Sequence, residues 1–432
     1  MLSKEENELL TRTGPGTPMG DLFRRFWLPV MLAEEVPAPD CPAVRLRILG
    51  EDLLGFRDSD GRVGIIDPYC AHRGAPLFFG RNEERGLRCV YHGWKYDVEG
   101  NCIDIPNIAE GASYKKKVKL FSYPVAEKAG FIWAYMGPHE KQPPLPKFEW
   151  MDLPRSYYVV SKIVSNCNYF QSLEGSMDPT HGSFLHSTPD AAANPMGRLG
   201  LFDTDNSHRD RMARYLRVDD TAYGVVGVVE RNAPNDRRQV SINHWVAPTF
   251  TPQARGSGSL DLGYMRVRVP IDDENSCVFR IRYDPRQPLP DRIRHEYNDG
   301  DFLTPELIPG TYWPVANKEN DYFIDRFMQR NFTFTGIKSF PLQDIAVIEN
   351  QWGPIADRTR EHLVASDEMI IRVRRHLLKM ARDLGEGIEP PAPHRPELFA
   401  TQPITMRLPK DAPVEEAITP HLVAAGVGEI GR

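Results

Sequence analysis

Two pairs of cysteine and histidine carry the strongest chemical signal in this sequence. Cys70 and His72 are followed, after sixteen residues, by Cys89 and His92. Two ligands on each of two loops can hold one zinc ion tetrahedrally. They can also hold a [2Fe–2S] cluster with both cysteines on one iron and both histidines on the other.

The residues around these pairs favour the iron–sulfur cluster over zinc. Gly74 and Gly93 each follow a pair closely, and glycine lets the backbone turn its N–H groups toward cluster sulfurs. Trp94 and Tyr96 can shield the site, which tunes the potential of a cluster. The surrounding pattern is one of short strands and turns, unlike a zinc finger. We therefore expect a [2Fe–2S] cluster.

A second group of candidate ligands contains no cysteine. Asp178 and His181 are three residues apart, so on a helix they would share a face. His181 and His186 are five apart and converge only if the helix is distorted or ends between them. Two histidines and a carboxylate with open positions suit non-haem Fe(II) and O₂ chemistry. The two groups together predict an electron store beside an oxygen-activating iron.

Composition limits the other classes of function. A length of 432 residues allows two or three domains, and 41% hydrophobic with 26% charged residues is ordinary for a globular protein. A net charge of −6 does not indicate nucleic-acid binding. No apolar run has the length of a membrane span, the acidic start lacks a secretory signal, and six cysteines make no disulfide framework. We expect a cytoplasmic protein.

The pattern of elements predicts an α+β fold with antiparallel sheets. Short strands and turns run from 44 to 133, and the proline-rich stretch 142–146 is typical of a linker. A helical pattern from 344 to 383 is interrupted at Gly353-Pro354, and the tail from 389 is expected to wrap over the surface. Further strands are predicted at 156–164, 223–230, 239–246, 260–270 and 276–284.

Several segments resemble one enzyme family. Residues 68–75 and 89–96 resemble the cluster-binding loops of Rieske domains, and 168–186 resembles the iron segment of Rieske non-haem iron oxygenase α subunits. Residues 16–30 and 353–362 are similar to the phthalate 4,5-dioxygenase and 3-chlorobenzoate dioxygenase group. The resemblance implies an antiparallel β Rieske domain over 40–145. It also implies a catalytic domain of helix-grip type, an antiparallel sheet with helices, formed by 1–39 and 146–432.

The resemblance also implies roles for single residues. It makes Cys70, His72, Cys89 and His92 the ligands of the [2Fe–2S] cluster. It makes His181, His186 and Asp344 the ligands of one mononuclear Fe(II), with Asp357 and Glu349 as the alternatives to Asp344. Asp178 matches the aspartate that links an iron-ligand histidine to the Rieske histidine of a neighbouring subunit.

One position departs from the family pattern. Many relatives carry an asparagine shortly before the bridging aspartate, whereas Glu174-Gly175 stands here. Glu174 either approaches the iron or is a structural carboxylate, and the sequence leaves both readings open.

The implied activity is cis-dihydroxylation of a small aromatic carboxylate with O₂, within aromatic catabolism. Electrons must come from a separate NAD(P)H-dependent reductase, since no nucleotide-binding G-x-G-x-x-G follows a strand and no second cysteine cluster is present. The family transfers electrons between subunits, so a homotrimer or stacked hexamer is expected. An O- or N-demethylase is the alternative enzyme. A Rieske electron carrier would leave 150–432 unexplained.

A substrate carboxylate in an apolar pocket needs a fixed cation, best an arginine. We expect one or two of the strand arginines to face the pocket and the others to lie on the surface. His244 and Asn243 on another strand could bind a carboxylate or merely pack. The candidate arginines are Arg214, Arg217, Arg266, Arg268, Arg280 and Arg282.

Overall fold

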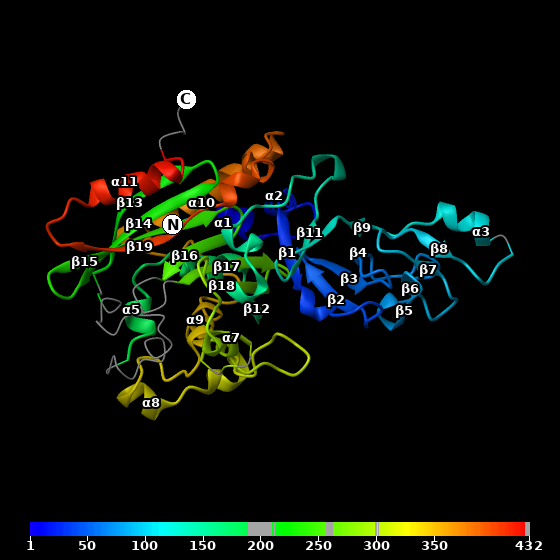
Figure 1. The fold of residues 1–432 in the computed structure, drawn as a ribbon, viewed down its shortest axis with the longest axis horizontal. Helices are drawn as coiled ribbons and strands as arrows, with labels where there is room; N and C mark the ends of the chain where they lie inside the picture. The colour runs from blue at the N-terminus through cyan, green and yellow to red at the C-terminus, as the bar shows by residue number, and fades with distance from the viewer. Residues whose placement is uncertain are drawn as a thin grey trace.

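The structure is a computed structural model that describes residues 1–109, 111–188, 210, 212–255, 262–298, 300 and 302–427. Two units lie along the long axis of the molecule, a small β-rich one and a larger one built around a wide sheet (Figure 1). The first helix, α1, and the last described helix, α11, both lie at the larger unit. The predicted α+β fold, with an antiparallel β domain preceding an antiparallel sheet with helices, is confirmed.

The smaller unit consists of two four-stranded antiparallel sheets, ordered β2-β3-β4-β9 and β5-β6-β7-β8. The segment 58–61 joins β3 to β4, with Gly61 at φ +81°. The second sheet lies at the end of the molecule away from the larger unit (Figure 1). The strands are β2 (Val44–Ile48), β3 (Glu51–Arg57), β4 (Val63–Ile66), β5 (Arg81–Glu83), β6 (Gly86–Arg88), β7 (Lys95–Tyr96), β8 (Cys102–Asp104) and β9 (Ser122–Tyr123).

One eight-stranded antiparallel sheet forms the larger unit, in the order β12-β18-β17-β16-β15-β14-β13 with β19 paired to β15. Each strand predicted beyond residue 150 falls on one of these strands. The tail does more than wrap over the surface as predicted, because β19 adds six residues to the sheet. The strands are β12 (Tyr158–Ser165), β13 (Arg214–Thr221), β14 (Gly224–Ala233), β15 (Arg237–Val246), β16 (Phe250–Arg255), β17 (Leu262–Pro270), β18 (Ser276–Tyr283) and β19 (Ile404–Pro409).

The described helices are mostly short and lie around this sheet, except α3, which lies beside β8 in the smaller unit (Figure 1). Within the described residues, no helix is long and apolar enough to span a membrane. The helices are α1 (Lys4–Thr11), α2 (Pro18–Phe23), α3 (Gly111–Tyr114), α4 (Tyr169–Gly175), α5 (Gly182–Leu185), α7 (Asp291–Asn298), α8 (Arg326–Asn331), α9 (Phe340–Ile348), α10 (Glu368–Gly385) and α11 (Val414–Ala424).

The helical pattern expected from 344 to 383 forms two helices separated by a wider gap than predicted. Helix α9 ends at Ile348 and α10 begins only at Glu368. Trp352 and Gly353 have φ of +56° and +116°, which no helix accommodates, and Pro354 follows them. The chain between the helices is therefore irregular rather than kinked at one point.

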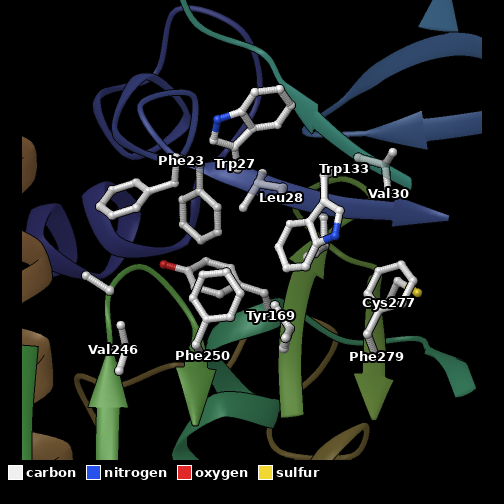
Figure 2. Packing of buried hydrophobic residues seen from close by; sticks show 14 of the residues in the cluster. Phe23, Trp27, Leu28, Val30, Trp133, Tyr169, Val246, Phe250, Cys277 and Phe279 are labelled. Atoms are coloured by element: carbon white, nitrogen blue, oxygen red, sulfur yellow. The ribbon is translucent and has the colours of Figure 1, made fainter. Parts of the chain in front are cut away.

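The central sheet packs one apolar face against a small sheet of β1 (Trp27–Leu32), β11 (Phe131–Tyr135) and β10 (Val125–Lys128). Figure 2 shows Phe250 and Phe279 from the central sheet meeting Trp133 and its neighbours. The Trp133 and Phe250 rings stack with centroids 6.4 Å apart. Removing this apolar surface from water stabilises the packing and fixes the small sheet on the large one.

The opposite face of β17 and β18 carries arginines instead of apolar residues. Arg266 and Arg268 alternate with apolar residues along β17, and Arg280 and Arg282 do so along β18. Helices α4 and α7 pack on this face, since Arg268 reaches a hydroxyl of the first and Arg282 a hydroxyl of the second. The side chains of α9 line a cavity over the same face. This charged layer positions the second group of candidate ligands.

Candidate functional site

The two cysteine–histidine loops of the smaller unit have the same backbone arrangement. Cys70 follows β4, and Cys89 lies between β6 and β7. The N–H of Gly74 donates to the carbonyl of Cys70, and the N–H of Gly93 donates to that of Cys89, both at 2.9 Å. The two glycines have φ of +68° and +77°, a conformation that glycine adopts without strain. The glycines predicted to shape these loops therefore do so.

The two histidines of these loops lie against each other. The ring centroids of His72 and His92 are 4.6 Å apart, and Trp94 stacks on His72 with centroids 4.7 Å apart and planes at 10°. Nδ1 of His72 is buried and has no hydrogen-bond partner in the described chain. A buried ring nitrogen without a partner fits a metal ligand.

Both cysteine thiols are buried between the loops. Burial raises the pKa of the Cys70 thiol, and the nearby Cys89 thiol adds to the rise. The Tyr96 hydroxyl accepts from the N–H of Ala71 and is hydrogen-bonded to Sγ of Cys70, each at 3.2 Å. Two buried thiols and two imidazoles on paired loops therefore fit a [2Fe–2S] cluster, with Trp94 and Tyr96 covering it as expected.

In the larger unit, His181, His186 and Asp344 converge. Nε2 of His186 lies 3.1 Å and Nε2 of His181 3.8 Å from Oδ1 of Asp344. Their ligand atoms all lie within 4.8 Å of one another. Among the described residues, no other three His, Cys, Asp or Glu side chains do so. Two imidazoles and one carboxylate at this spacing fit a single iron ion and leave positions open for other ligands.

A one-turn helix brings the two histidines together. His181 directly precedes α5 and His186 directly follows it. The two side chains converge despite their five-residue spacing because the helix ends between them. This is one of the two ways that the sequence allowed.

Contacts of α9 hold His186 in one orientation. Its ring stacks on Phe340 with centroids 3.8 Å apart, and its Nδ1 lies 2.7 Å from Oε1 of Gln343. The Gln343 amide nitrogen donates to the carbonyl of Ile337 at 2.8 Å, which fixes Oε1 toward the histidine. Nδ1–H of His186 therefore donates, and Nε2 is left with a lone pair for a metal.

Asp178 lies beside His181, although the backbone conformation that places it there differs from the one predicted. The prediction that both share a helix face is wrong, because α4 ends at Gly175 and Asp178 lies in the turn that follows. Oδ1 of Asp178 accepts from the N–H and hydroxyl of Thr180, both at 2.7 Å. Oδ2 lies 3.6 Å from Nδ1 of His181, which also contacts the Asp178 carbonyl at 3.1 Å. The turn, not helical periodicity, makes this contact.

The electrostatics of Asp344 and His186 suit metal ligands. Burial tends to raise the pKa of Asp344, but the nearby His186, Arg266 and His181 hold it well below its usual range. Burial lowers the pKa of His186. An ionised carboxylate and a neutral imidazole are the protonation states that a metal requires.

The alternative third ligands lie elsewhere. Glu349 accepts from the Tyr322 hydroxyl at 2.7 Å and from the N–H of Asn166 at 2.6 Å. Asp357 accepts from the backbone and the hydroxyl of Thr359. The geometry therefore favours Asp344 over both.

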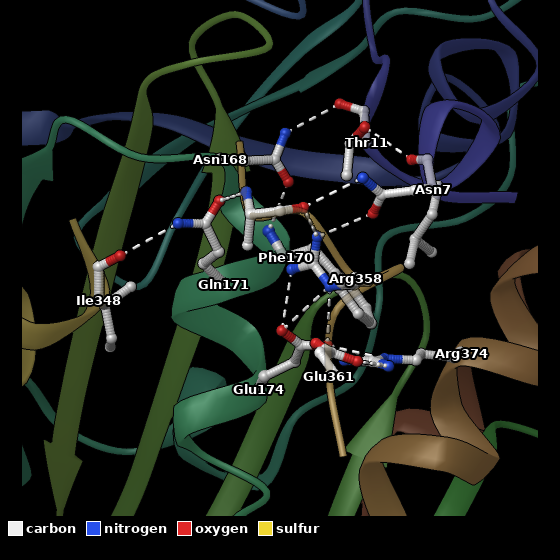
Figure 3. Close-up of polar contacts among 12 residues, drawn as sticks. Asn7, Thr11, Asn168, Phe170, Gln171, Glu174, Ile348, Arg358, Glu361 and Arg374 are labelled. Atoms are coloured by element: carbon white, nitrogen blue, oxygen red, sulfur yellow. Dashed lines mark hydrogen bonds and ion pairs between the residues drawn. The ribbon is translucent and has the colours of Figure 1, made fainter. Parts of the chain in front are cut away.

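Glu174 belongs to a buried ion-pair network. Its carboxylate accepts from Nη2 of Arg358 at 2.8 Å and from Nε of Arg374 at 2.8 Å, and Glu361 pairs with the second arginine (Figure 3). Arg358 also reaches Oδ1 of Asn7 on α1. Of the two readings that the sequence left open, the structural carboxylate is the one that these contacts favour.

A pocket of about 160 Å³ opens beside the two histidines. Of the predicted arginines, Arg266 lines it, but this side chain already contacts Asp344 and the hydroxyl of Tyr264. Asn243 also lines it, whereas the His244 ring is buried against the Tyr223 hydroxyl.

The expectation that the other arginines lie on the surface is wrong for Arg268, Arg280 and Arg282, which are buried because helices and loops cover that face of the sheet. Arg214 and Arg217 form ion pairs with Glu230, Asp219 and Glu415, and Arg268, Arg280 and Arg282 lie under the helices.

Arg231 is a pocket residue that sequence reasoning missed. It lines the pocket together with Val229, two positions earlier on β14. Residues two positions apart on a strand face the same side of the sheet, and this spacing is the signal that could have identified Arg231. Within the described residues it forms no ion pair or hydrogen bond. Burial lowers its pKa, although Tyr215, Asp210 and Asp178 lie near enough to raise it. Among the residues that the structure describes, the pocket therefore contains a cation without a direct ion-pair partner.

Comparisons with known proteins agree with this geometry. Residues 26–124 match the Rieske [2Fe–2S] domain, and residues 134–400 match the LigXa C-terminal domain-like family. The chain is 38% identical to the phthalate 4,5-dioxygenase oxygenase subunit of Pseudomonas putida over 384 residues, covering 88% of this chain and 86% of the relative. It is 35% identical to the 3-chlorobenzoate-3,4-dioxygenase oxygenase subunit of Comamonas testosteroni over 405 residues, covering 88% and 89%.

More distant proteins share the whole architecture. The 5,5'-dehydrodivanillate O-demethylase oxygenase subunit of Sphingobium sp. is 30% identical over 445 residues, covering 100% of this chain and 93% of the relative. The structure of NdmA QL mutant with caffeine from Pseudomonas putida CBB5 aligns with a TM-score of 0.60 at 19% identity, covering 90% and 98%. The fold, the two matched families and the long alignments at 35–38% identity lead to one assignment. The chain belongs to the Rieske non-haem iron ring-hydroxylating oxygenases as an α subunit, a family whose cofactors are a [2Fe–2S] cluster and a mononuclear iron.

Proposed function

We propose that this chain is the terminal oxygenase of a system that cis-dihydroxylates a small aromatic carboxylate of the phthalate, isophthalate or 3-halobenzoate type. The observation that carries this proposal is the pocket of about 160 Å³ that His181, His186 and the unpaired Arg231 line together. A cavity of ~150 Å³ accommodates benzene, so a single ring fits. The relatives named for phthalate and 3-chlorobenzoate support an aromatic acid.

We assign the [2Fe–2S] cluster to Cys70, His72, Cys89 and His92, within a Rieske domain of residues 40–145. When bound, the cluster supplies single electrons and the mononuclear iron activates O₂. The chain contributes two buried thiols, a tyrosine hydroxyl hydrogen-bonded to one of them, and a tryptophan stacked on a histidine. These contacts exclude water from one side of the site.

We assign the mononuclear iron to His181, His186 and Asp344, within a catalytic domain of residues 1–39 and 146–432. Gln343 presents Nε2 of His186, and Arg266, 3.7 Å from Oδ2 of Asp344, keeps that carboxylate ionised. The pocket side of this group is where substrate and O₂ meet.

Arg231 is the proposed partner of the substrate carboxylate. Its guanidinium loses hydration in the pocket, and within the described residues Asp178 and Asp210 attract it without forming a direct ion pair. A carboxylate substrate supplies the missing charge and two acceptor oxygens in the planar geometry that arginine prefers. Asn243 and Gln253 line the same pocket and offer amide groups around the ring.

Electron transfer is proposed to run between subunits of a homotrimer or stacked hexamer, with a separate NAD(P)H-dependent reductase as donor. In one chain, α5 and the sheet β5–β8 lie at opposite ends of the molecule (Figure 1). The Asp178 side chain is 25% exposed while touching His181, so a neighbouring subunit can reach it. Dependence on NAD(P)H is consistent with a cytoplasmic location.

The experiment is a substrate screen with a surrogate reductase. Phthalate, isophthalate and 3-chlorobenzoate should support coupled NADH and O₂ consumption, whereas their methyl esters and amides should not. With ¹⁸O₂, the cis-dihydrodiol should carry two labelled oxygens, because substrate, O₂, two electrons and two protons combine. If acids and esters are turned over equally, the proposal that a cation in the pocket binds the substrate carboxylate is wrong.

An Arg231→Met variant tests the anchor directly. A desolvated arginine–carboxylate pair that loses one partner costs roughly 3–5 kcal/mol, so kcat/KM for acids should fall at least ~100-fold. Arg214→Met is the matched control, since this arginine is 70% exposed and paired with Glu230. If acids are turned over equally by both variants, another residue binds the carboxylate.

Mono-oxygenation, including O-demethylation, of an aromatic acid is the second candidate function. The observation that favours it is the O-demethylase relative, which aligns with 100% of this chain. The metal sites are the same for both reactions, and pocket shape decides between them. Release of formaldehyde from a methoxybenzoate, with one labelled oxygen going to water, would select this reading.

A further inference from the structure

A second cavity, of about 40 Å³, lies between the central sheet and helix α9. Arg266, Arg268 and Arg280 line it from the sheet, and Asp344 and Ile348 line it from the helix. It is far smaller than the ~150 Å³ that accommodates benzene, but larger than the roughly 10–15 Å³ that one water needs. The cavity therefore suits a small polar species and excludes the aromatic substrate.

The strand register concentrates positive charge at this cavity. Arg266 lies directly opposite Arg280 across the antiparallel pair β17 and β18, and Arg268 is two positions further along the same face. Like charges directly opposite each other destabilise a sheet. Arg268 and Arg280 are only 1% and 4% exposed, so water does not screen them.

The hydrogen-bond partners of Arg268 and Arg280 are neutral. Arg268 donates to the hydroxyls of Ser172, Thr251 and Ser176. In a buried site these groups satisfy hydrogen bonds but supply no opposite charge.

The same holds for Arg280. It donates to the carbonyl of Leu303 and the hydroxyl of Thr304. Its Nε is buried and has no hydrogen-bond partner in the part of the chain that the structure describes.

Asp344 is the carboxylate that faces this cluster, and its charge is already shared. Its Oδ2 lies 3.7 Å from Arg266, while its Oδ1 faces His181 and His186. Burial and the neighbouring Arg266 lower the pKa of Arg268 to about 9, even with Asp344 nearby. Three buried cations with one shared carboxylate leave an excess of positive charge, which is strongly destabilising unless a counter-ion is present.

We propose that this cavity binds one small monovalent inorganic anion of chloride size, held by Arg266, Arg268 and Arg280. Nε of Arg280 supplies a donor, and the volume holds a single ion with little space besides. The site does not depend on the proposed substrate. Its expected role is to balance the charged layer beneath α9, so that Asp344 remains directed toward the two histidines.

The test measures thermal unfolding of the holoenzyme in sodium chloride and in sodium gluconate at equal ionic strength, since gluconate is too large for the cavity. Chloride should raise Tm saturably by several degrees, and gluconate should not. Arg280→Met should lose this chloride dependence. Arg214→Gln, which removes an exposed cation, should retain it. Because Arg280→Met also loses two hydrogen bonds, only the dependence on anion is compared, not the absolute Tm.

Two further measurements apply even if Arg280→Met does not fold. Equilibrium dialysis of the wild-type holoenzyme with labelled chloride should give one ion per chain. Crystals grown in sodium bromide should show an anomalous peak between Arg268 and Arg280. Equal Tm in chloride and gluconate, or a bromide peak only elsewhere, would overturn the proposal. If formate displaces labelled chloride at a concentration much lower than that of chloride, the bound anion is a carboxylate and not a halide, and the proposal is overturned.

Discussion

Replacement of Glu174 by glutamine should destabilise the catalytic domain without removing either metal. The Glu174 carboxylate neutralises two arginines whose side chains are 0% and 4% exposed, Arg358 and Arg374. Glutamine keeps the shape but not the charge. Glu361 still pairs with Arg374, so the loss falls mainly on Arg358.

The magnitude follows from burial. Breaking a buried pair by removing one partner costs roughly 3–5 kcal/mol. The guanidinium of Arg358 retains Asn7, the Ala356 carbonyl and the ring of Phe170, 5.0 Å away, which places the cost near the lower limit. A loss of about 3 kcal/mol in a domain of this size lowers Tm by roughly 6 °C.

The assay is thermal unfolding followed by circular dichroism, with metal analysis of the folded protein. Glu8→Gln is the matched control, because its pair with Arg12 is half exposed and worth about 0–1 kcal/mol. The pKa of Glu174 is lowered below its ordinary 4.5, so its stabilisation is fully present above pH 4.5 and is lost as pH falls through the folded value. The gap between wild type and Glu174→Gln should therefore close in acid.

Two results would refute this reasoning. A Tm equal to that of the Glu8→Gln control would mean that the network contributes no stability. Normal Tm with loss of mononuclear iron would mean that Glu174 acts at the iron, the other reading that the sequence allowed.

The remaining predictions concern the two metal sites. Cys89→Ser should lose the visible absorbance and the reduced-state EPR signal of a mixed Cys/His cluster, and a protein containing one zinc and no sulfide would contradict the assignment. His186→Ala should lose the mononuclear iron and turnover but keep the cluster spectrum; full activity would exclude this ligand. Asp178→Asn should keep both metals and the oligomer yet slow substrate-dependent reoxidation of the reduced cluster by orders of magnitude, as stopped-flow absorbance would show. An unchanged rate would exclude the coupling role.

The sequence alone indicated the ligand types of the cysteine–histidine site. Cys70, His72, Cys89 and His92 stand in spacings that few other sites use, and the glycines after them define the loops. Ligand type and local spacing are properties of neighbouring residues, so they are visible without a fold. The alternating strands and the amphipathic α10 are equally local patterns.

Tertiary structure decided what depends on residues far apart in the chain. Asp344 lies 158 residues beyond His186, and without the family resemblance nothing in the sequence separated it from Glu349 and Asp357. The fold separates them because α9 holds the Asp344 carboxylate beside Nε2 of His186, which directly follows α5. In the same way, the fold brings Arg358 and Arg374 to Glu174, so that its carboxylate forms buried ion pairs.

The distribution of charge across the sheet was also beyond local patterns. Arg266 and Arg280 look alike in sequence, since each stands between apolar residues on a strand, whereas Arg231 stands between Glu230 and Asn232. Which of them meets a carboxylate, a hydroxyl or an open pocket depends on what packs over that face. Burial and the identity of long-range partners set the energy of a charge, and both exist only once the helices cover the sheet.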